Sequence, residues 1–292
     1  MSETFTDANG VRLCHEAFTQ PSPSAAAGTS GAAGDPLVVL IMGLGLDLLW
    51  WREDFCRAIA ARGLRVVRFD NRDVGRSTAF AGPGASATQV LTRRARPVYT
   101  LADMADDVAG LVAALDERGA HVVGASLGAC VAQEVAIRHP RLTRSLVSIM
   151  GRPGDGRSGR VTVRGKLEFL RGGDLVATFR RIGSAGRGAA DDEDVRVLER
   201  ASARREQGDG SGPGRQLAAM IGERDRTPGL RGLDVPALVV HGDRDAIIAP
   251  SGGRATAAAI PNARLLVIEG MGHDLPRYLW PPLLDAMTEL WS

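Results

Sequence analysis

Short apolar runs of strand length alternate with segments of helical periodicity along the first half of the chain. The strand-like runs are 37–42, 65–70, 121–125 and 145–150, and the helical segments are 51–63, 100–119 and 127–140. Strands that are apolar along their whole length are buried on both faces, and parallel strands need a crossover connection between them. The pattern therefore predicts an α/β protein with a mostly parallel central sheet flanked by helices.

The alternation returns near the C-terminus. Strands are predicted at 237–241 and 264–268, and helices at 251–262 and 281–291. At the N-terminus, two strand-like pieces flank Asn9-Gly10, a pair that is typical of a two-residue hairpin turn. Residues 20–36 are rich in Pro, Ala, Gly and Ser, and they are predicted to form a flexible loop.

The interval between these two parts, residues 151–232, has a different character. It contains helical patterns at 167–182, 192–206 and 215–224, no strand-like run, and 17 of the 36 glycines in the chain. Because glycine weakens helices, this segment is predicted to be a mobile helical cap or lid. We therefore predict a core domain made of residues 1–150 and 233–292, with the cap inserted between them.

Composition and charge exclude several kinds of partner. The 292 residues carry a formal net charge of +2, too small to draw the chain to nucleic acid or to a membrane surface. The apolar run at 37–51 is too short to span a bilayer and contains Asp47. No secretion signal is evident, so a cytoplasmic protein with a small-molecule partner is expected. The arginine pair Arg204-Arg205 is predicted to be solvated surface.

The cysteines give no sign of a metal site or of disulfides. Cys14, Cys56 and Cys130 are far apart, and none belongs to a C-x-x-C pair. Each lies in an apolar stretch, where a cysteine usually acts as a small hydrophobic residue. We therefore expect three buried, unpaired thiols and no bound metal.

A serine stands between two glycines where strand 121–125 gives way to the next helix. The stretch reads Gly124-Ala125-Ser126-Leu127-Gly128. A serine hydroxyl is a weak nucleophile unless it is aimed at the substrate and paired with a base. A tight strand-to-helix turn does the aiming, and glycines leave room where a Cβ would collide. Ser126 is the predicted nucleophile, and the alternative is a glycine-rich turn with an incidental serine.

Candidate partners for Ser126 follow the last two predicted strands. Asp243 and Asp245 come after the first of them, and His273 comes after the second. The carboxyl ends of parallel strands meet at one edge of a sheet, where ligands bind. The order serine, acid, histidine is that of an α/β-hydrolase triad, so His273 is the predicted base. Spacing alone leaves Asp243 and Asp245 as alternatives for the acid.

The other histidines are predicted to be structural or exposed. His121 begins the strand before the serine, His139 lies at a helix end, and His15 lies in the N-terminal hairpin. His241 directly precedes the loop that carries the candidate acids. It is therefore predicted to support the acid without touching the substrate.

Two backbone amides are candidates for stabilising a developing oxyanion. Leu127 follows the serine at a helix N-terminus, where amide groups favour negative charge. The loop after strand 37–42 begins Met-Gly-Leu-Gly at 42–45, and its glycines free the backbone. The amide of Leu44 is therefore the predicted second donor, and the alternative for this loop is a plain glycine-rich turn. Trp50 and Trp51 follow, and they are predicted to line an apolar substrate pocket or, alternatively, to pack in the core.

Five stretches together resemble the α/β-hydrolase family over nearly the whole chain apart from the cap. They are MGLG (42–45), FDNRDVGRS (69–77), GASLG (124–128), HGDRD (241–245) and GMGHDLP (270–276). MGLG followed by WWREDF (50–55), and then DNRDVGRST (70–78), is similar to the bacterial hydrolase subgroup that contains aclacinomycin methylesterase. This resemblance implies an α/β-hydrolase fold and a Ser-His-Asp triad.

The resemblance also assigns roles to individual residues. The catalytic acid of the family's G-x-x-D pattern falls on Asp245, which favours it over Asp243. Met42 replaces a histidine that the family often has, but the donor is a backbone amide, so Leu44 keeps its role. The family's loop after its fourth strand pins the floor of the active site, a structural role that falls here on Asp70, Arg72, Asp73 and Arg76.

The sequence thus predicts a serine hydrolase that cleaves a carboxylic ester of a small or medium apolar substrate through an acyl-enzyme. Such chemistry needs no metal and no organic cofactor. Thioesterases, lactonases, carbon–carbon bond hydrolases and cofactor-free haloperoxidases share the triad and stay open, as does a small-molecule receptor on the same fold. Ser126 argues against an epoxide hydrolase or a dehalogenase, which would need an aspartate there.

Overall fold

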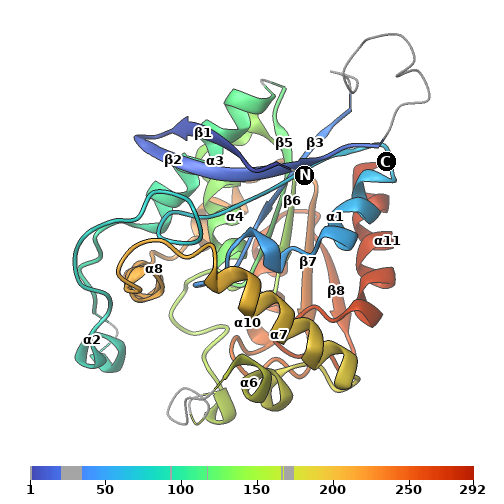
Figure 1. The fold of residues 1–292 in the computed structure, drawn as a ribbon. Coiled ribbons are helices and arrows are strands. Elements are labelled where there is room, and N and C mark those ends of the chain that lie inside the picture. The colour runs from blue at the N-terminus through green and yellow to red at the C-terminus, as the bar shows by residue number, and fades with distance from the viewer. Residues whose placement is uncertain (1, 21–34, 93, 117, 166, 168–173) are drawn as a thin grey trace.

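The centre of the protein is an eight-stranded, mostly parallel sheet (Figure 1). A computed structural model describes residues 2–20, 35–92, 94–116, 118–165, 167 and 174–292. The strands are β1 (Thr4–Ala8), β2 (Val11–Phe18), β3 (Leu37–Ile41), β4 (Arg65–Phe69), β5 (Ala120–Ala125), β6 (Thr143–Ile149), β7 (Ala237–Gly242) and β8 (Arg264–Ile268). Their order is β1-β2-β4-β3-β5-β6-β7-β8. All pairs from β4 to β8 are parallel, as the sequence predicts.

The N-terminal hairpin forms the antiparallel edge of the sheet. Asn9 and Gly10 have φ values of 48° and 75°, the positive values that a type I′ hairpin turn requires at both central positions. Strand β1 pairs with β2, and β2 pairs antiparallel with β4. The predicted hairpin is therefore confirmed, whereas residues 21–34 of the predicted loop 20–36 lie outside the described residues.

Helices bury both faces of the sheet. Alternate residues of β3 point to opposite faces, so Val39 joins one hydrophobic cluster while Val38 and Leu40 join the other. The first cluster includes side chains of α3 (Leu101–Leu115), α4 (Leu127–Arg138) and α10 (Ser251–Ala259), and the second includes side chains of α1 (Glu53–Ala60) and α11 (Trp280–Trp291). The double burial explains why the inner strands β3, β5, β6 and β7 are apolar along most of their length, whereas the edge strand β8 is largely exposed.

The ends of α3 show which boundary signals are reliable. Thr100, where the predicted helical segment 100–119 begins, caps the helix in a reciprocal capping box with Asp103. The helix ends at Leu115, before the predicted stop at Gly119, because Asp116 already has extended backbone angles. Gly119, with φ 84°, instead forms the turn into β5.

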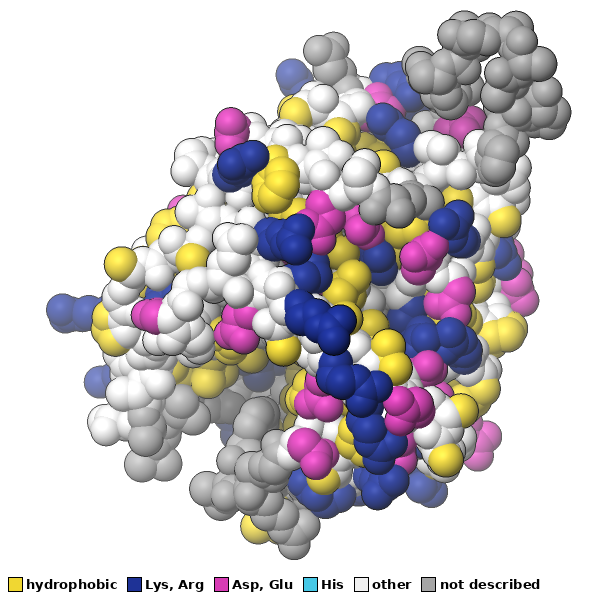
Figure 2. Space-filling model, in the orientation of Figure 1, with side chains coloured by type: hydrophobic (Ala, Val, Ile, Leu, Met, Phe, Trp, Pro, Cys, Tyr) yellow, Lys and Arg dark blue, Asp and Glu magenta, His cyan; other side chains and the backbone are white. Residues whose placement is uncertain are grey.

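The segment between β6 and β7 is helical. It contains α6 (Leu175–Ile182), α7 (Ala189–Ala203), α8 (Gly212–Ile221) and α9 (Thr227–Arg231), and no strand occurs among its described residues. Two short helices, α9 and α2 (Ala87–Thr92), fall outside the predictions because they are too short to show a period. Residues 166 and 168–173, where the helix 167–182 is predicted to begin, are outside the described part. Figure 2 shows arginines interspersed with acidic side chains over the face that carries α7.

The three cysteines of the chain form no disulfide bond. All three cysteines are buried and unpaired, and burial raises the pKa of Cys14 and Cys56 to about 12.

Within the described ranges, no helix combines the length and the apolar character needed to cross a membrane. No cluster of potential metal ligands occurs among the same residues.

Candidate active site

Ser126 occupies a strained turn between β5 and α4. Its backbone angles are φ 57° and ψ −117°, a region that residues other than glycine rarely adopt. The flanking glycines permit this turn, because a Cβ on Gly124 would lie 2.0 Å from the carbonyl oxygen of Gly128. A Cβ on Gly128 would in turn lie 2.1 Å from the carbonyl oxygen of Ile41. This geometry is that of a nucleophile elbow.

His273 lies between Ser126 and Asp245. Its Nε2 is 2.9 Å from the serine Oγ, and its Nδ1 is 2.7 Å from Oδ2 of Asp245. The Asp245 side chain is 0% exposed and that of His273 is 12% exposed. The structure therefore joins the three predicted side chains, from the ends of β5, β7 and β8, in one hydrogen-bonded chain that begins at a buried acid.

Contacts around Asp245 favour its charged form. Its Oδ1 accepts hydrogen bonds from the N–H groups of Ile247 and Ile248, each at 2.9 Å. Burial opposes the charge, but interactions with His273 and His241 outweigh it and hold the pKa of Asp245 well below its usual range. Nε2 of His241 lies 3.4 Å from Oδ2 of Asp245, so this histidine lies beside the acid, where it is predicted.

Asp243, the alternative acid, has a different environment. Its side chain belongs to an exposed residue, and its Oδ1 accepts a hydrogen bond from the N–H of Gly270 at 2.7 Å. Among the described residues it shares no hydrogen bond with His273. Of the two candidates, Asp245 is therefore the one that contacts the imidazole.

The loop after β3 lies directly against the serine. A Cβ on Gly43 would lie 3.3 Å from the Cβ of Ser126 and 3.8 Å from its Oγ. The N–H of Leu46 donates to the carbonyl oxygen of Gly43 at 3.3 Å and closes a tight turn. No hydrogen-bond acceptor for the N–H of Leu44 or of Leu127 occurs in the part of the protein that the structure describes. Both predicted donors are thus unpaired next to Ser126.

Trp50 and Trp51 have different surroundings. Trp50 is half-buried, with its ring centroid 6.0 Å from that of Phe179 in α6. Trp51 is 1% exposed and stacks on Phe55 with a centroid separation of 5.6 Å. Trp51 is therefore a core residue, which corrects the prediction that it lines a substrate pocket and supports the alternative interpretation. Trp50 lies where the core meets the helices between β6 and β7, the segment that we call the insertion.

The remaining histidines make local contacts. Nδ1 of His121 lies 2.8 Å from Oγ of Ser145, and Nε2 of His15 lies 3.0 Å from Oγ1 of Thr6. Nε2 of His139 lies 2.7 Å from a carboxylate oxygen of Asp106 in α3. Each therefore has the structural place that the sequence predicts.

The inserted helices hold the loop that carries His273, and no pattern in the sequence indicates this. Asp274 accepts hydrogen bonds from the N–H of Ser184 at 2.8 Å and from Arg187 at 2.7 Å. Oγ of Ser184 accepts from the N–H of Gly272 at 2.9 Å. The N–H of His273 donates to the last carbonyl of α6 at 3.2 Å. Hydrogen bonds on both sides of the histidine thus fix its backbone.

A second set of contacts joins the insertion to the loops after β3 and β4. Arg205, which follows α7, pairs with Asp47 at 2.5 Å and with Asp70 at 2.8 Å. Arg215 of α8 pairs with Asp73 at 2.9 Å, and these two side chains are 1% and 0% exposed. The prediction of a solvated surface is therefore wrong for Arg205, because acidic partners from the core compensate its buried charge. Asp70 and Asp73 have the predicted structural role, with arginines of the insertion as their partners.

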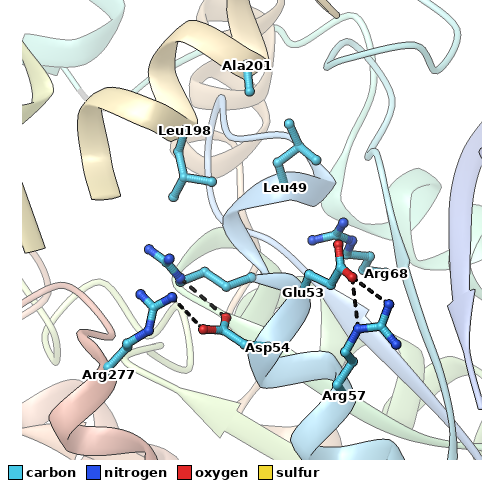
Figure 3. A pocket seen from close by; sticks show the side chains of 9 residues that line it. Leu49, Glu53, Asp54, Arg57, Arg68, Leu198, Ala201 and Arg277 are labelled. Atoms are coloured by element: carbon cyan, nitrogen blue, oxygen red, sulfur yellow. Dashed lines mark hydrogen bonds and ion pairs between the residues drawn. The ribbon is translucent and has the colours of Figure 1, made fainter. Parts of the chain in front are cut away.

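Two cavities lie beside the insertion. The larger, of about 390 Å³, lies between α1 and α7, and Figure 3 shows ion pairs at its wall between Arg277 and Asp54 and between Arg57 and Glu53. The smaller, of about 360 Å³, includes residues 183–185 and Arg244 in its lining. Neither lining includes Ser126 or His273, so we assign the substrate to neither.

Together, the fold and the strained serine turn define a hydrolase of the α/β type. Residues 36–181 match the alpha/beta hydrolase fold family, and residues 220–278 match the TAP-like protein family. The chain belongs to the α/β-hydrolase fold family. The predicted fold and the predicted family resemblance are confirmed.

Known proteins of this kind span nearly the whole chain. The candidate non-heme bromoperoxidase BpoC of Mycobacterium tuberculosis is 30% identical over 258 residues, which cover 82% of this chain and 87% of that protein. Rhodomycin D methylesterase DauP of Streptomyces sp. strain C5 is 28% identical over 289 residues, with coverages of 88% and 92%. The enol-lactonase of Burkholderia xenovorans LB400 has the same fold, with a TM-score of 0.71 and 21% identity over 99% of both chains. These relatives support the predicted enzyme class, a hydrolase that acts on ester bonds.

Proposed function

We propose that the protein is a serine hydrolase that cleaves a carboxylic ester of a small or medium apolar molecule. The hydrogen-bonded chain from Ser126 through His273 to Asp245 carries the proposal. Acyl transfer needs an aimed nucleophile, a base within hydrogen-bond reach and an acid that orients the base. The 28% identity to a protein named a methylesterase supports an ester as the substrate.

The first half of the reaction forms an acyl-enzyme. Nε2 of His273 takes the proton of Ser126 as Oγ attacks the ester carbonyl carbon. The amides of Leu44 and Leu127 donate to the resulting oxyanion, and each such donor contributes about 2.7–4 kcal/mol in comparable enzymes. Asp245 stabilises the imidazolium. His273 then gives its proton to the leaving oxygen, the carbon–oxygen bond breaks, and the alcohol departs.

The second half returns the enzyme to its starting state. His273 takes a proton from a water molecule, whose oxygen attacks the acyl carbonyl carbon. The same two amides hold the second oxyanion. The bond to Ser126 breaks, His273 returns the proton to the serine oxygen, and the carboxylic acid leaves. We assign Trp50 to the apolar wall of the substrate site and residues 151–232 to its lid.

Turnover of p-nitrophenyl acetate, butyrate and octanoate tests the proposal. We expect activity on at least one ester, and a loss of about 10⁴- to 10⁶-fold in Ser126→Ala. Ser145→Ala is the matched control, since Ser145 is buried on β6 beside His121 and should leave turnover unchanged.

Normal rates in Ser126→Ala would contradict the mechanism. If the esters are inert, a thioester and a lactone are tested next. Turnover of either that depends on Ser126 would retain the nucleophile and replace the ester as the substrate. Ligand binding without turnover of any of these compounds would contradict the enzyme proposal and favour a receptor.

A further inference from the structure

Helix α8 of the insertion reaches the turn that carries the proposed donor Leu44. Oε1 of Gln216 accepts a hydrogen bond from the N–H of Gly45 at 2.8 Å, and its Nε2 donates to the carbonyl oxygen of Arg72 at 2.9 Å. The Gln216 side chain is 0% exposed. Both ends of one buried amide are therefore used, one on the turn and one on the loop after β4.

The turn is held at the two peptide groups on either side of Leu44. The bond from Leu46 to Gly43 closes the turn through the first peptide, which carries the N–H of Leu44. The middle peptide, between Leu44 and Gly45, is the one whose rotation interconverts type I and type II turns. Gly45 has φ 70° and can adopt either sign of φ. Gln216 binds the N–H of this middle peptide and favours one orientation. Because the two peptides share the Cα of Leu44, this bond also limits the tilt of the N–H of Leu44.

Gln216 stands on a fixed support. The neighbouring Arg215 forms the fully buried ion pair with Asp73. A Cβ on Gly45 would lie 3.1 Å from the side chain of Pro213, so the first turn of α8 packs directly on the loop. Helix α8 is therefore joined to the turn by direct packing as well as by the Gln216 hydrogen bond.

We infer that Gln216 is a positioning residue for the oxyanion-binding amide of Leu44, supplied by the insertion and not by the sheet. The inference rests on the proposed function. A donor aimed at charge that develops only in the transition state raises kcat and leaves substrate binding nearly unchanged. Since misplacement by about 1 Å costs about 100-fold in rate, loss of both Gln216 contacts should lower kcat by about 10- to 100-fold.

The variant Gln216→Met removes both hydrogen bonds at similar side-chain volume. We expect kcat to fall as stated, KM to change by less than about twofold, and affinity for a trifluoromethyl ketone transition-state analogue to fall in parallel with kcat. The control is Gln133→Met. Gln133 is also 0% exposed and also bonds to the insertion, through Arg226, but it contacts Ser148 of β6 in place of the turn. The control should keep kcat and analogue affinity.

A second variant, Gln216→Glu, adds a second measurement, the pH dependence of kcat. This dependence would not change if Gln216 had a purely structural role. The protonated carboxyl donates to Arg72 and accepts from Gly45 as the amide does, whereas the carboxylate cannot donate. Burial raises the pKa of such a carboxyl, so the ratio of its kcat to that of the wild type should rise as the pH falls from about 8 to about 6. Taking the ratio removes any pH dependence that the two proteins share.

Three results separate the possible failures. Wild-type kcat in Gln216→Met, together with a pH-independent ratio for Gln216→Glu, would overturn the positioning role. Full activity of Ser126→Ala in the same assay would overturn the proposed function itself. An inactive Ser126→Ala beside a fully active Gln216→Met would overturn only the inference about Gln216.

Discussion

The sheet edge and the helical insertion contribute to the site in different ways. The sheet edge supplies Ser126, Asp245 and His273, each in a glycine-containing motif at a strand end. The insertion supplies supports: Ser184 binds Asp274 at a separation of 90 residues along the chain, and Gln216 binds Gly45 at a separation of 171. Short motifs thus provide the proposed reactive groups, whereas buried polar contacts between distant segments hold the loops beside them.

The largest effect is expected at the sheet edge, in the acid. Asp245→Asn should lower kcat/KM by about 10⁴-fold, because the amide favours the wrong tautomer of His273. Asp243→Asn is the matched control and should change kcat/KM by less than about twofold, since Asp243 is exposed and its carboxylate accepts from the turn at Gly270. A greater loss in Asp243→Asn would reverse the assignment.

The next effect tests how the insertion is anchored. Arg215→Met leaves the buried carboxylate of Asp73 without its cationic partner, and should lower the free energy of unfolding by about 3–5 kcal/mol. Arg200→Met removes an exposed pair with Glu193 in the same insertion, and should cost less than about 0.5 kcal/mol. Urea unfolding of both variants measures the difference. Equal losses would show that the buried pair does not anchor α8.

A smaller effect is expected on the pH dependence of stability, and it comes from His121 in the sheet. Burial, together with the charge of Arg144, lowers the pKa of His121 to about 4, from about 6.5 in the unfolded chain. Because the unfolded chain binds the proton first, this stabilisation is complete above pH 6.5, declines as the pH falls and stops declining below about pH 4. Between about pH 7.5 and pH 5 the loss is about 2 kcal/mol. Urea unfolding should show that His121→Gln lacks this part of the decline, and an identical decline would contradict the assignment.

The smallest effect is expected on kcat/KM, from the contacts between the insertion and the loop that carries His273. Asp274→Asn removes the ion pair with Arg187 and should lower kcat/KM by about tenfold, because the backbone of His273 is held less firmly. Glu193→Gln, at an exposed pair of α7, is the control and should leave kcat/KM unchanged. Wild-type kcat/KM in Asp274→Asn would show that these bonds do not align the histidine.

The sequence predicts the sheet and the hydrogen-bonded residues Ser126, Asp245 and His273 because the patterns that indicate them are local. Apolar strand residues, the cap at Thr100 and the glycines around Ser126 each determine the structure of residues only a few positions away. Spacing alone leaves Asp243 and Asp245 as alternatives because they share one loop, whereas the family resemblance favours Asp245. Only the folded loop shows that the N–H groups of Ile247 and Ile248 hold Asp245 against the imidazole.

The supports could not be predicted in this way. Gln216 and Arg205 lie in or next to helices with ordinary amphipathic patterns, and their partners lie more than a hundred residues away. Whether an arginine is solvated or buried depends on carboxylates that only the tertiary fold brings near. Trp51 is a similar case, since its place in the core depends on Phe55 and the packing of α1.

Covalent labelling with diisopropyl fluorophosphate tests the central claim most directly, since it reports whether Ser126 is a nucleophile activated by His273. We expect one phosphoryl group on the peptide that contains Ser126, no label in Ser126→Ala, and labelling about 10²- to 10⁴-fold slower in His273→Ala. A label on another residue, or equal rates in the wild type and in His273→Ala, would contradict the account.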